Sequence, residues 1–312
     1  MGGTSYSARD WDSYKTTAST KTNDAIFTNK SGLHKDLDPK NIVVREARDS
    51  VVNPVTTPVL AGIDLTGSMG SLSRQIVTKG LGQIFEELIS RKVVPGPQFA
   101  FAGFGDVLMD YDAWFQLSQF ESDTASLTPQ LEKMYRVGEG GGGNSSESNG
   151  LVWYGALTRT VHDAYSVRGK KGYLFTVGDE EVPPNLKPED ILRVFGGDIP
   201  QSVPTNEQLL EALSQQWEVF HIMVEQGSHM RSARQKVVSS WTDLMGQRAI
   251  LLANVDNLSE VMISCIEVCE GRNVDDVAKS WSGDTSLVVA KAISGLNGLA
   301  TRPGDSGAVQ RF

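Results

Sequence analysis

The chain has 312 residues, of which 39% are hydrophobic and 21% are charged, as is typical of a globular protein with a sizeable core. Its 29 Lys and Arg residues against 38 Asp and Glu residues give a net charge of -9. Because nucleic acids and anionic membranes are polyanions, we expect neither as a partner of this acidic protein.

Targeting and redox signals point to an intracellular protein. No apolar run reaches the roughly 20 residues that span a bilayer, and the first residues lack the apolar segment of a secretory signal. Cys265 and Cys269 share one face of an expected helix and fit a reduced, buried pair, because a lone C-x-x-x-C lacks the second pair of a zinc site. The sequence therefore predicts a cytoplasmic location, in the host cytoplasm if a phage encodes the protein.

Polar residues dominate the first part of the chain. Residues 1–57 are rich in Ser, Thr, Asn, Asp and Lys, which predicts an extended, partly ordered N-terminal arm. The run "NIVVREARDSVVNPVTTP" within this arm could add an edge strand, and the arm could mediate self-association.

From Val59 onward, expected strands and helices alternate. Strands are expected at residues 59–63, 98–104 and 113–120 and within "KKGYLFTVGDEE", "WEVFHIMVEQ" and "RAILLANV". Helices are expected at residues 71–92, 129–136, 150–165, 188–195, 206–215, 232–245 and 258–270. This alternation predicts a doubly wound, mostly parallel α/β sheet with helices on both faces. We assign residues 58–272 to this domain and residues 273–312 to a C-terminal helical extension with a flexible tail.

The loops that follow the strands carry acids. In an open α/β sheet, the loops at the carboxyl ends of parallel strands meet at one edge, where ligands bind. Three of these loops begin with or soon reach an acid, namely Asp64, Asp106 and Asp179, and "GEGGGGNSSESNG" precedes the middle helix. We therefore expect these segments to lie close together.

The first loop, "IDLTGSMG", places oxygen side chains at alternate positions. Asp64, Thr66 and Ser68 can face one point, which suits a hard cation, whereas a helix cap needs only one hydroxyl. A catalytic serine is disfavoured because the G-x-S-x-G pattern requires glycine where Thr66 stands, and no histidine motif accompanies Ser68.

The glycine-rich run also fits a dinucleotide-binding pattern. Gly138, Gly140 and Gly143 match G-x-G-x-x-G, and Asp163 follows at a suitable distance. The preceding "PQLEKMYRV" predicts a helix, however, and a dinucleotide site requires a strand there. Dinucleotide binding is therefore disfavoured.

The three loops together resemble the metal-ion-dependent adhesion site of the von Willebrand factor A domain. "IDLTGSMG" matches the D-x-[ST]-x-S pattern of the first loop, "GGGGNSSES" stands in the place of the second, and "LFTVGDEE" ends on the acid of the third. The flanking "REARDSVVNPVTTPVLAGIDLTGSMG" and "FQLSQFESD" look like a sub-group of uncharacterised bacterial and phage proteins. The resemblance covers roughly residues 45–182 and implies a six-stranded sheet of order 3-2-1-4-5-6 with one antiparallel edge.

The resemblance also implies a metal site. The metal residues it implies are Asp64, Thr66, Ser68, Asn144, Glu147 and Asp179, with Asp106, Ser145 and Ser148 in support. Most members offer a threonine in the second loop, where this chain offers Asn144 or Glu147 instead. Few carboxylates and several hydroxyls favour Mg²⁺ or Mn²⁺ over Ca²⁺.

The function that the resemblance implies is non-enzymatic binding. An Asp or Glu of a protein partner would complete the shell of the ion, in an intracellular assembly or regulatory role. Two alternatives stay open. One is a metal-assisted hydrolase with Glu147 or Glu180 as general base. The other is a structural component of a phage particle or similar complex, with the arm packed on a neighbour.

Overall fold

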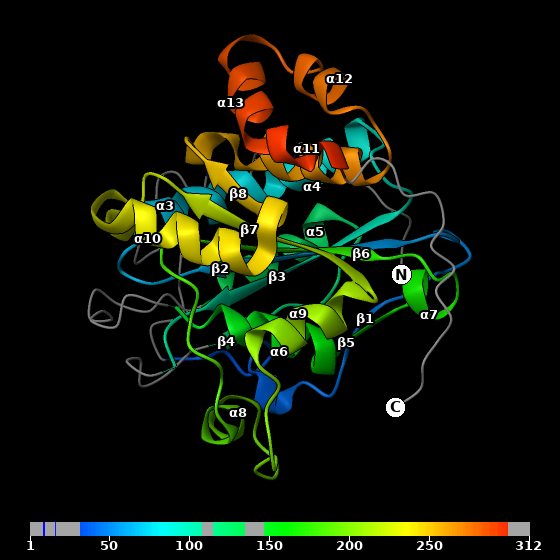
Figure 1. The fold of residues 1–312 in the computed structure, drawn as a ribbon. Coiled ribbons are helices and arrows are strands. Elements are labelled where there is room, and N and C mark those ends of the chain that lie inside the picture. The colour runs from blue at the N-terminus through cyan, green and yellow to red at the C-terminus, as the bar shows by residue number, and fades with distance from the viewer. Residues whose placement is uncertain (1–8, 10–15, 17–31, 108–114, 135–146, 299–312) are drawn as a thin grey trace.

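The computed structural model describes residues 32–107, 115–134 and 147–298 together with Arg9 and Thr16, and Figure 1 shows its fold. At its centre lies a six-stranded sheet of order β4-β3-β2-β6-β7-β8. Its parallel strands are β2 (Thr57–Asp64), β3 (Pro97–Phe104), β6 (Gly172–Gly178), β7 (Trp217–Val224) and β8 (Ala249–Leu252). At one edge, β4 (Phe115–Leu117) runs antiparallel to β3. The mostly parallel α/β sheet predicted from the sequence is confirmed.

Helices cover both faces of this sheet (Figure 1). One layer contains α4 (Leu81–Ser90), α11 (Leu258–Cys269), α12 (Val274–Lys279) and α13 (Gly283–Ile293). The other contains α6 (Asn149–Arg159), α8 (Pro188–Phe195), α9 (Asn206–Ser214) and α10 (Ser228–Met245). Because strand side chains alternate between faces, Val59 and Ile63 of β2 pack with the first layer and Leu60 packs with the second. Burial of each such side chain contributes about 1.5–3 kcal/mol.

The glycine in the middle of β2 lets helix α6 approach the sheet closely. A Cβ at Gly62 would lie 2.9 Å from the Val152 side chain of α6. Helix α6 is therefore fixed tightly against the strand that ends in Asp64, which keeps Glu147, just before α6, near that residue.

The long helix predicted after β2 forms as one run with an irregular middle. It consists of α3 (Ser71–Gln75), a π-helical turn at Ile76–Gly80, and α4. Leu81, Ile84, Phe85 and Leu88 are buried at helical spacing, which accounts for the amphipathic pattern in the sequence.

One predicted helix is shorter than expected. The helix predicted over residues 150–165 ends at Arg159 and is followed by β5 (Thr160–His162) and α7 (Asp163–Ser166). Strand β5 pairs in parallel with β1 (Arg45–Ala47), which is the strand expected in the arm. Strands β1 and β5 form a separate two-stranded sheet, so β1 does not extend the edge of the main sheet.

Helices α5 (Thr124–Glu132) and α10 begin a full turn or more before their predicted first residues. Helix α5 begins before Pro129 because Asp123 caps it, with its Oδ1 accepting a hydrogen bond from the Ser126 N–H at 2.8 Å. Helix α10 begins at Ser228 and therefore includes part of the loop after β7.

Within the described residues, no helix is both long and apolar enough to span a membrane.

Candidate metal centre

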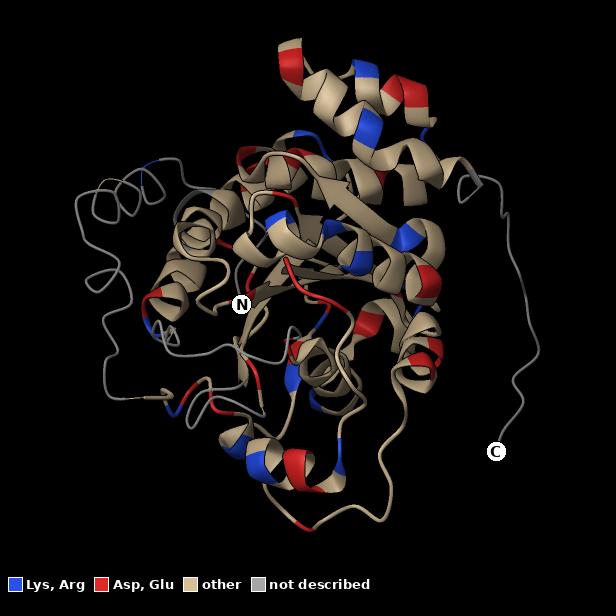
Figure 2. Ribbon diagram, turned by 60° about the vertical axis from the view of Figure 1, so that its left-hand side comes forward, with Lys and Arg blue, Asp and Glu red and all other residues tan. Residues whose placement is uncertain are grey.

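The predicted site residues gather where β2 and β6 end. Asp64 is the last residue of β2, and Asp179 directly follows β6, its neighbour in the sheet. The chain order reverses between these two strands, a position at which open α/β sheets bind ligands. Figure 2 turns this edge of the sheet forward and shows acidic segments in its loops.

A continuous chain of hydrogen bonds joins four of the predicted residues. Oδ1 of Asp64 accepts from the N–H of Thr66 at 2.8 Å and from its hydroxyl at 2.6 Å. The Thr66 and Ser68 hydroxyl oxygens lie 3.1 Å apart, and the Ser68 hydroxyl donates to Oδ1 of Asp179 at 2.7 Å. The D-x-T-x-S spacing therefore turns its three side chains toward one place.

The loop after β7 donates hydrogen bonds to both Asp179 and Ser68. The N–H of His229 donates to Oδ2 of Asp179 at 2.9 Å. The N–H and the hydroxyl of Ser228 both donate to the carbonyl of Ser68, at 3.2 and 3.0 Å. A Cβ at Gly227 would lie 2.2 Å from the Asp179 side chain, so only glycine leaves room for that carboxylate.

The sequence did not predict that Ser228 and His229 would hold the site residues in place. Two of their three donors are backbone N–H groups, which every residue other than proline carries. The one available signal was the glycine that opens "GSHM" on a loop already expected at this edge.

Glu147 reaches the same place from the loop before α6. The Thr66 hydroxyl is near enough to the Glu147 carboxylate to lower its pKa, and the charges of Asp64, Glu180 and Asp106 raise that pKa. Its neighbour Ser148 does not join the acids. The N–H of Ser148 donates to the Gly105 carbonyl at 3.0 Å, and its hydroxyl accepts from the Val107 N–H at 2.9 Å. Ser148 thus fastens this loop to the loop after β3, in which Asp106 lies buried.

Burial and mutual repulsion raise the pKa values of these acids. Burial and the charge of Asp179 raise the pKa of Asp64 well above its usual range. Burial, followed by the charges of Asp64, Glu180 and Asp106, raises the pKa of Glu147 to about 11. Burial and Asp179 raise the pKa of Glu180 to about 7. Ionisation of these acids therefore carries a free-energy cost, which a bound cation would remove.

Several buried oxygens at this edge lack a hydrogen bond. Within the described residues, no donor reaches Oδ2 of Asp64, Oε2 of Glu147 or Oε2 of Glu180. Buried carboxylate oxygens normally have partners, so these atoms fit a site that a cation completes.

The donor set is oxygen only, which suits Mg²⁺ or Mn²⁺. No three His, Cys, Asp or Glu side chains of the described residues are placed to hold an ion by themselves. An ion would therefore depend on the hydroxyls of Thr66 and Ser68 as well as on carboxylates and water. The residues present fit a metal site of the kind that the three-loop resemblance implies.

The other candidates are not among the described residues of this centre. Asn144, Ser145 and the glycines 138, 140 and 143 lie outside the described residues. Asp163 accepts hydrogen bonds from Arg48 and from the Asp49 N–H at the opposite end of the sheet, where it ties the arm to α7. The Ser68 hydroxyl bonds with Asp179 and Thr66, and no histidine ring of the described chain bonds with it. A serine nucleophile thus has no base here.

Comparisons with known proteins find likeness only among solved structures. No family model matches the chain, and no curated protein matches it. The pilus adhesin SpaC from Lactobacillus rhamnosus GG matches in two crystal structures, one of them of an open conformation, with 10% identity and TM-scores of 0.42 and 0.41. Each match covers 72% of this chain and 31% of the adhesin. Proximal thread matrix protein 1 from the mussel byssus matches at 14% identity and a TM-score of 0.37, covering 68% of this chain and 45% of that protein.

The chain spans less than half the length of each of these structures. Identities and TM-scores this low carry no conclusion about what the chain does.

Proposed function

We propose that this chain is a divalent-metal-dependent protein-binding module of the von Willebrand factor A type, which holds Mg²⁺ or Mn²⁺ at the carboxyl ends of β2 and β6. The observation that carries the proposal is the hydrogen-bonded chain from Asp64 through Thr66 and Ser68 to Asp179. Facing it are buried carboxylate oxygens without hydrogen-bond donors among the described residues.

The strand order supports the same proposal. Counted along the chain, the six strands of the main sheet are β2, β3, β4, β6, β7 and β8, so their spatial order reads 3-2-1-4-5-6. The third of these strands, β4, lies at one edge and is antiparallel. This is the order that the resemblance in the three loops implies.

Each residue has a definite part in this proposal. The Thr66 and Ser68 hydroxyls offer lone pairs to the ion, and Asp64 and Asp179 accept hydrogen bonds from these hydroxyls and so fix their orientation. The two aspartates are fully buried, whereas Ser68 and Gly67 are only half-buried. A partner would therefore reach the ion from the side of Ser68. When bound, the ion supplies a positive point of attachment and breaks no bond.

Calorimetry tests the metal site directly. Titration of Mg²⁺ and of Mn²⁺ into the wild type should give binding heat, and Asp64→Ala should abolish it. Asp275→Ala, which removes an exposed acid in the first turn of α12, is the matched control and should bind like the wild type. Equal heats in the wild type and in Asp64→Ala would contradict the site.

A second experiment separates metal-dependent binding from a purely structural role. Partners should be retained by the immobilised wild type in Mg²⁺, released by EDTA and absent from Asp64→Ala. Partners that persist in EDTA would instead favour the alternative of an assembly component, whose contacts do not need the ion.

A further inference from the structure

Glu147 makes this centre more acidic than the resemblance implies. It comes from the second loop, where most members of the resembled family offer a threonine. Glu147 is 4% exposed, the Thr66 hydroxyl is near enough to its carboxylate to lower its pKa, and its Oε2 has no donor among the described residues. A buried carboxylate with a free oxygen thus faces the same hydroxyl that faces Asp64.

The backbone holds Glu147 firmly in that place. Its carbonyl accepts from the Asn149 N–H at 2.8 Å and from the Asn149 side-chain amide at 3.2 Å. The next residue, Ser148, is bonded to both Gly105 and Val107. The carboxylate is therefore a fixed part of the centre and needs no partner to bring it there.

Charge then limits what else can approach an ion at this place. If Asp64, Asp179 and Glu147 ionise, they place three negative charges near an ion of charge two, and the charges of Asp106 and Glu180 also act on Glu147. A further carboxylate would meet net repulsion in a buried, weakly screened setting, whereas a neutral oxygen would not.

We infer that Glu147 is an internal carboxylate for the ion, so that the remaining open position takes a neutral oxygen, such as a peptide carbonyl or a hydroxyl, and excludes an Asp or Glu of the partner. This inference rests on the proposed metal site. It replaces the acidic partner group that the resemblance implies with a neutral one.

The test uses Mn²⁺, because water-proton relaxation reports how many waters remain on the bound ion. The full chain is loaded with Mn²⁺ and titrated with acetate, as a carboxylate probe, and with N-methylacetamide, as a peptide-carbonyl probe. Acetate should leave the relaxation of the wild type unchanged and should displace water in Glu147→Thr and Glu147→Gln. N-methylacetamide should displace water from the bound Mn²⁺ to the same extent in the wild type and in both variants.

Metal affinity gives a second readout. Loss of the internal carboxylate should weaken Mn²⁺ binding about 10- to 100-fold in both variants. Glu181→Gln is the matched control, because Glu181 lies at the same edge but faces His229 at 3.7 Å with a side chain 30% exposed. It should keep the acetate response and the Mn²⁺ affinity of the wild type.

The outcomes separate the two proposals. A wild type that binds no Mn²⁺ overturns the metal site and this inference together. A wild type that binds Mn²⁺ and also takes acetate as tightly as Glu147→Thr overturns the inference alone. Glu147→Gln keeps the size of the side chain and carries the comparison if circular dichroism shows that Glu147→Thr does not fold.

Discussion

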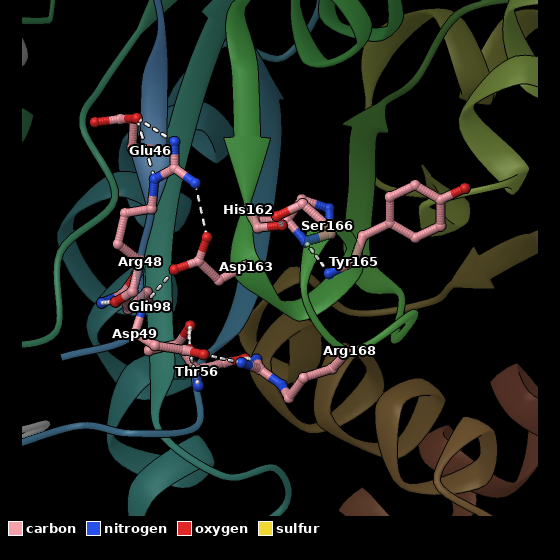
Figure 3. A network of polar contacts seen from close by, with 10 residues as sticks. All are labelled: Glu46, Arg48, Asp49, Thr56, Gln98, His162, Asp163, Tyr165, Ser166 and Arg168. Carbon is pink, nitrogen blue, oxygen red and sulfur yellow. Dashed lines mark hydrogen bonds and ion pairs between the residues drawn. The ribbon is translucent and has the colours of Figure 1, made fainter. Parts of the chain in front are cut away.

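At the amino ends of β2 and β6, acids are paired with arginines, whereas at the carboxyl ends of the same strands the acids face one another. Figure 3 shows the paired end, where Arg48 contacts Glu46 at 2.5 Å and Asp163 at 2.7 Å. Arg168 pairs with Asp49 and donates to the carbonyl of Thr56. This network fastens the arm to the loop between α7 and β6.

The pKa values of the two ends move in opposite directions. Burial alone would raise the pKa of Asp163, but hydrogen bonds from Arg48 and from the Asp49 N–H outweigh it and lower that pKa. At the other end, burial and the charge of Asp179 raise the pKa of Asp64. The contrast shows that acids stabilise the fold where they form ion pairs with arginines. Where none does, they destabilise it and leave room for a cation.

Removing an acid from the paired end should have the largest effect on stability. Asp49→Ala removes the partner of Arg168 and the acceptor for both the N–H and the hydroxyl of Thr56, at 3.0 and 2.8 Å. We expect the free energy of unfolding to fall by about 3 kcal/mol in chemical denaturation. Glu46→Ala, whose side chain is 43% exposed, should cost only about 0–1 kcal/mol. Equal losses in the two variants would break the comparison.

A smaller loss of unfolding free energy should follow from a substitution that crowds the acids at the carboxyl ends of β2 and β6. Gly227→Ala would place a Cβ 2.2 Å from the Asp179 side chain, so that carboxylate must move. We expect a loss of about 2 kcal/mol, together with a roughly 10- to 100-fold weaker affinity for Mg²⁺.

The matched control is Gly295→Ala. The nearest atom to a Cβ at Gly295 lies 3.8 Å away, an ordinary contact, so neither stability nor Mg²⁺ affinity should change. A Gly227→Ala protein that binds Mg²⁺ like the wild type would show that the position of Asp179 is unimportant for the ion.

Asp64→Asn should raise the unfolding free energy in EDTA, whereas Asp49→Ala and Gly227→Ala should lower it. The amide keeps an oxygen for the two hydrogen bonds from Thr66, and its new N–H₂ group replaces Oδ2, which has no donor among the described residues. Without metal, and at a pH high enough to ionise Asp64, we expect a gain of about 1 kcal/mol in unfolding free energy, because the amide avoids the cost of a buried negative charge. In Mg²⁺ the wild type should become the more stable of the two. A loss in EDTA as large as that of Asp49→Ala would mean that the two ends do not differ.

The sequence predicted the parts of the fold that depend on local pattern. Strands of continuous apolar residues such as Val59–Ile63 and amphipathic helices such as α4 follow from periodicity alone. The break in the helix after Arg159 does not, because Thr160–His162 becomes a strand by pairing with β1, which lies far away in the sequence. Pairing between distant segments overrides local preference there.

The candidate site was predictable where its chemistry lies in side chains at strand ends. Asp64 and Asp179 were expected at one edge because parallel strands end together, and Ser68 joins them. The contribution of Ser228 and His229 was not predictable, because they act mainly through backbone N–H groups that leave no mark on residue type.

The pH dependence of stability gives the mildest and most general test. Burial and Asp179 raise the pKa of Glu180 from 4.5 to about 7. A raised pKa means that its stabilising contribution is complete below about 4.5 and disappears as the pH rises through about 7. Glu147, with its pKa raised in the same direction, extends this loss to higher pH. In EDTA, the melting temperature should therefore fall between pH 5 and pH 8.

The paired end should not contribute to that fall. The pKa of Asp163 is lowered from 3.8, so its contribution is complete above that value and is lost only on acidification below it. Glu180→Gln should flatten the EDTA profile between pH 5 and pH 8, whereas Asp163→Asn should lower it evenly over this range. Saturating Mg²⁺ competes with protons for the carboxylates, so the stabilisation it gives should grow with pH. A melting temperature in EDTA that rises from pH 5 to pH 8 would show that the acids at the carboxyl ends are not a destabilising cluster. The case for a cation there would then lose its electrostatic basis.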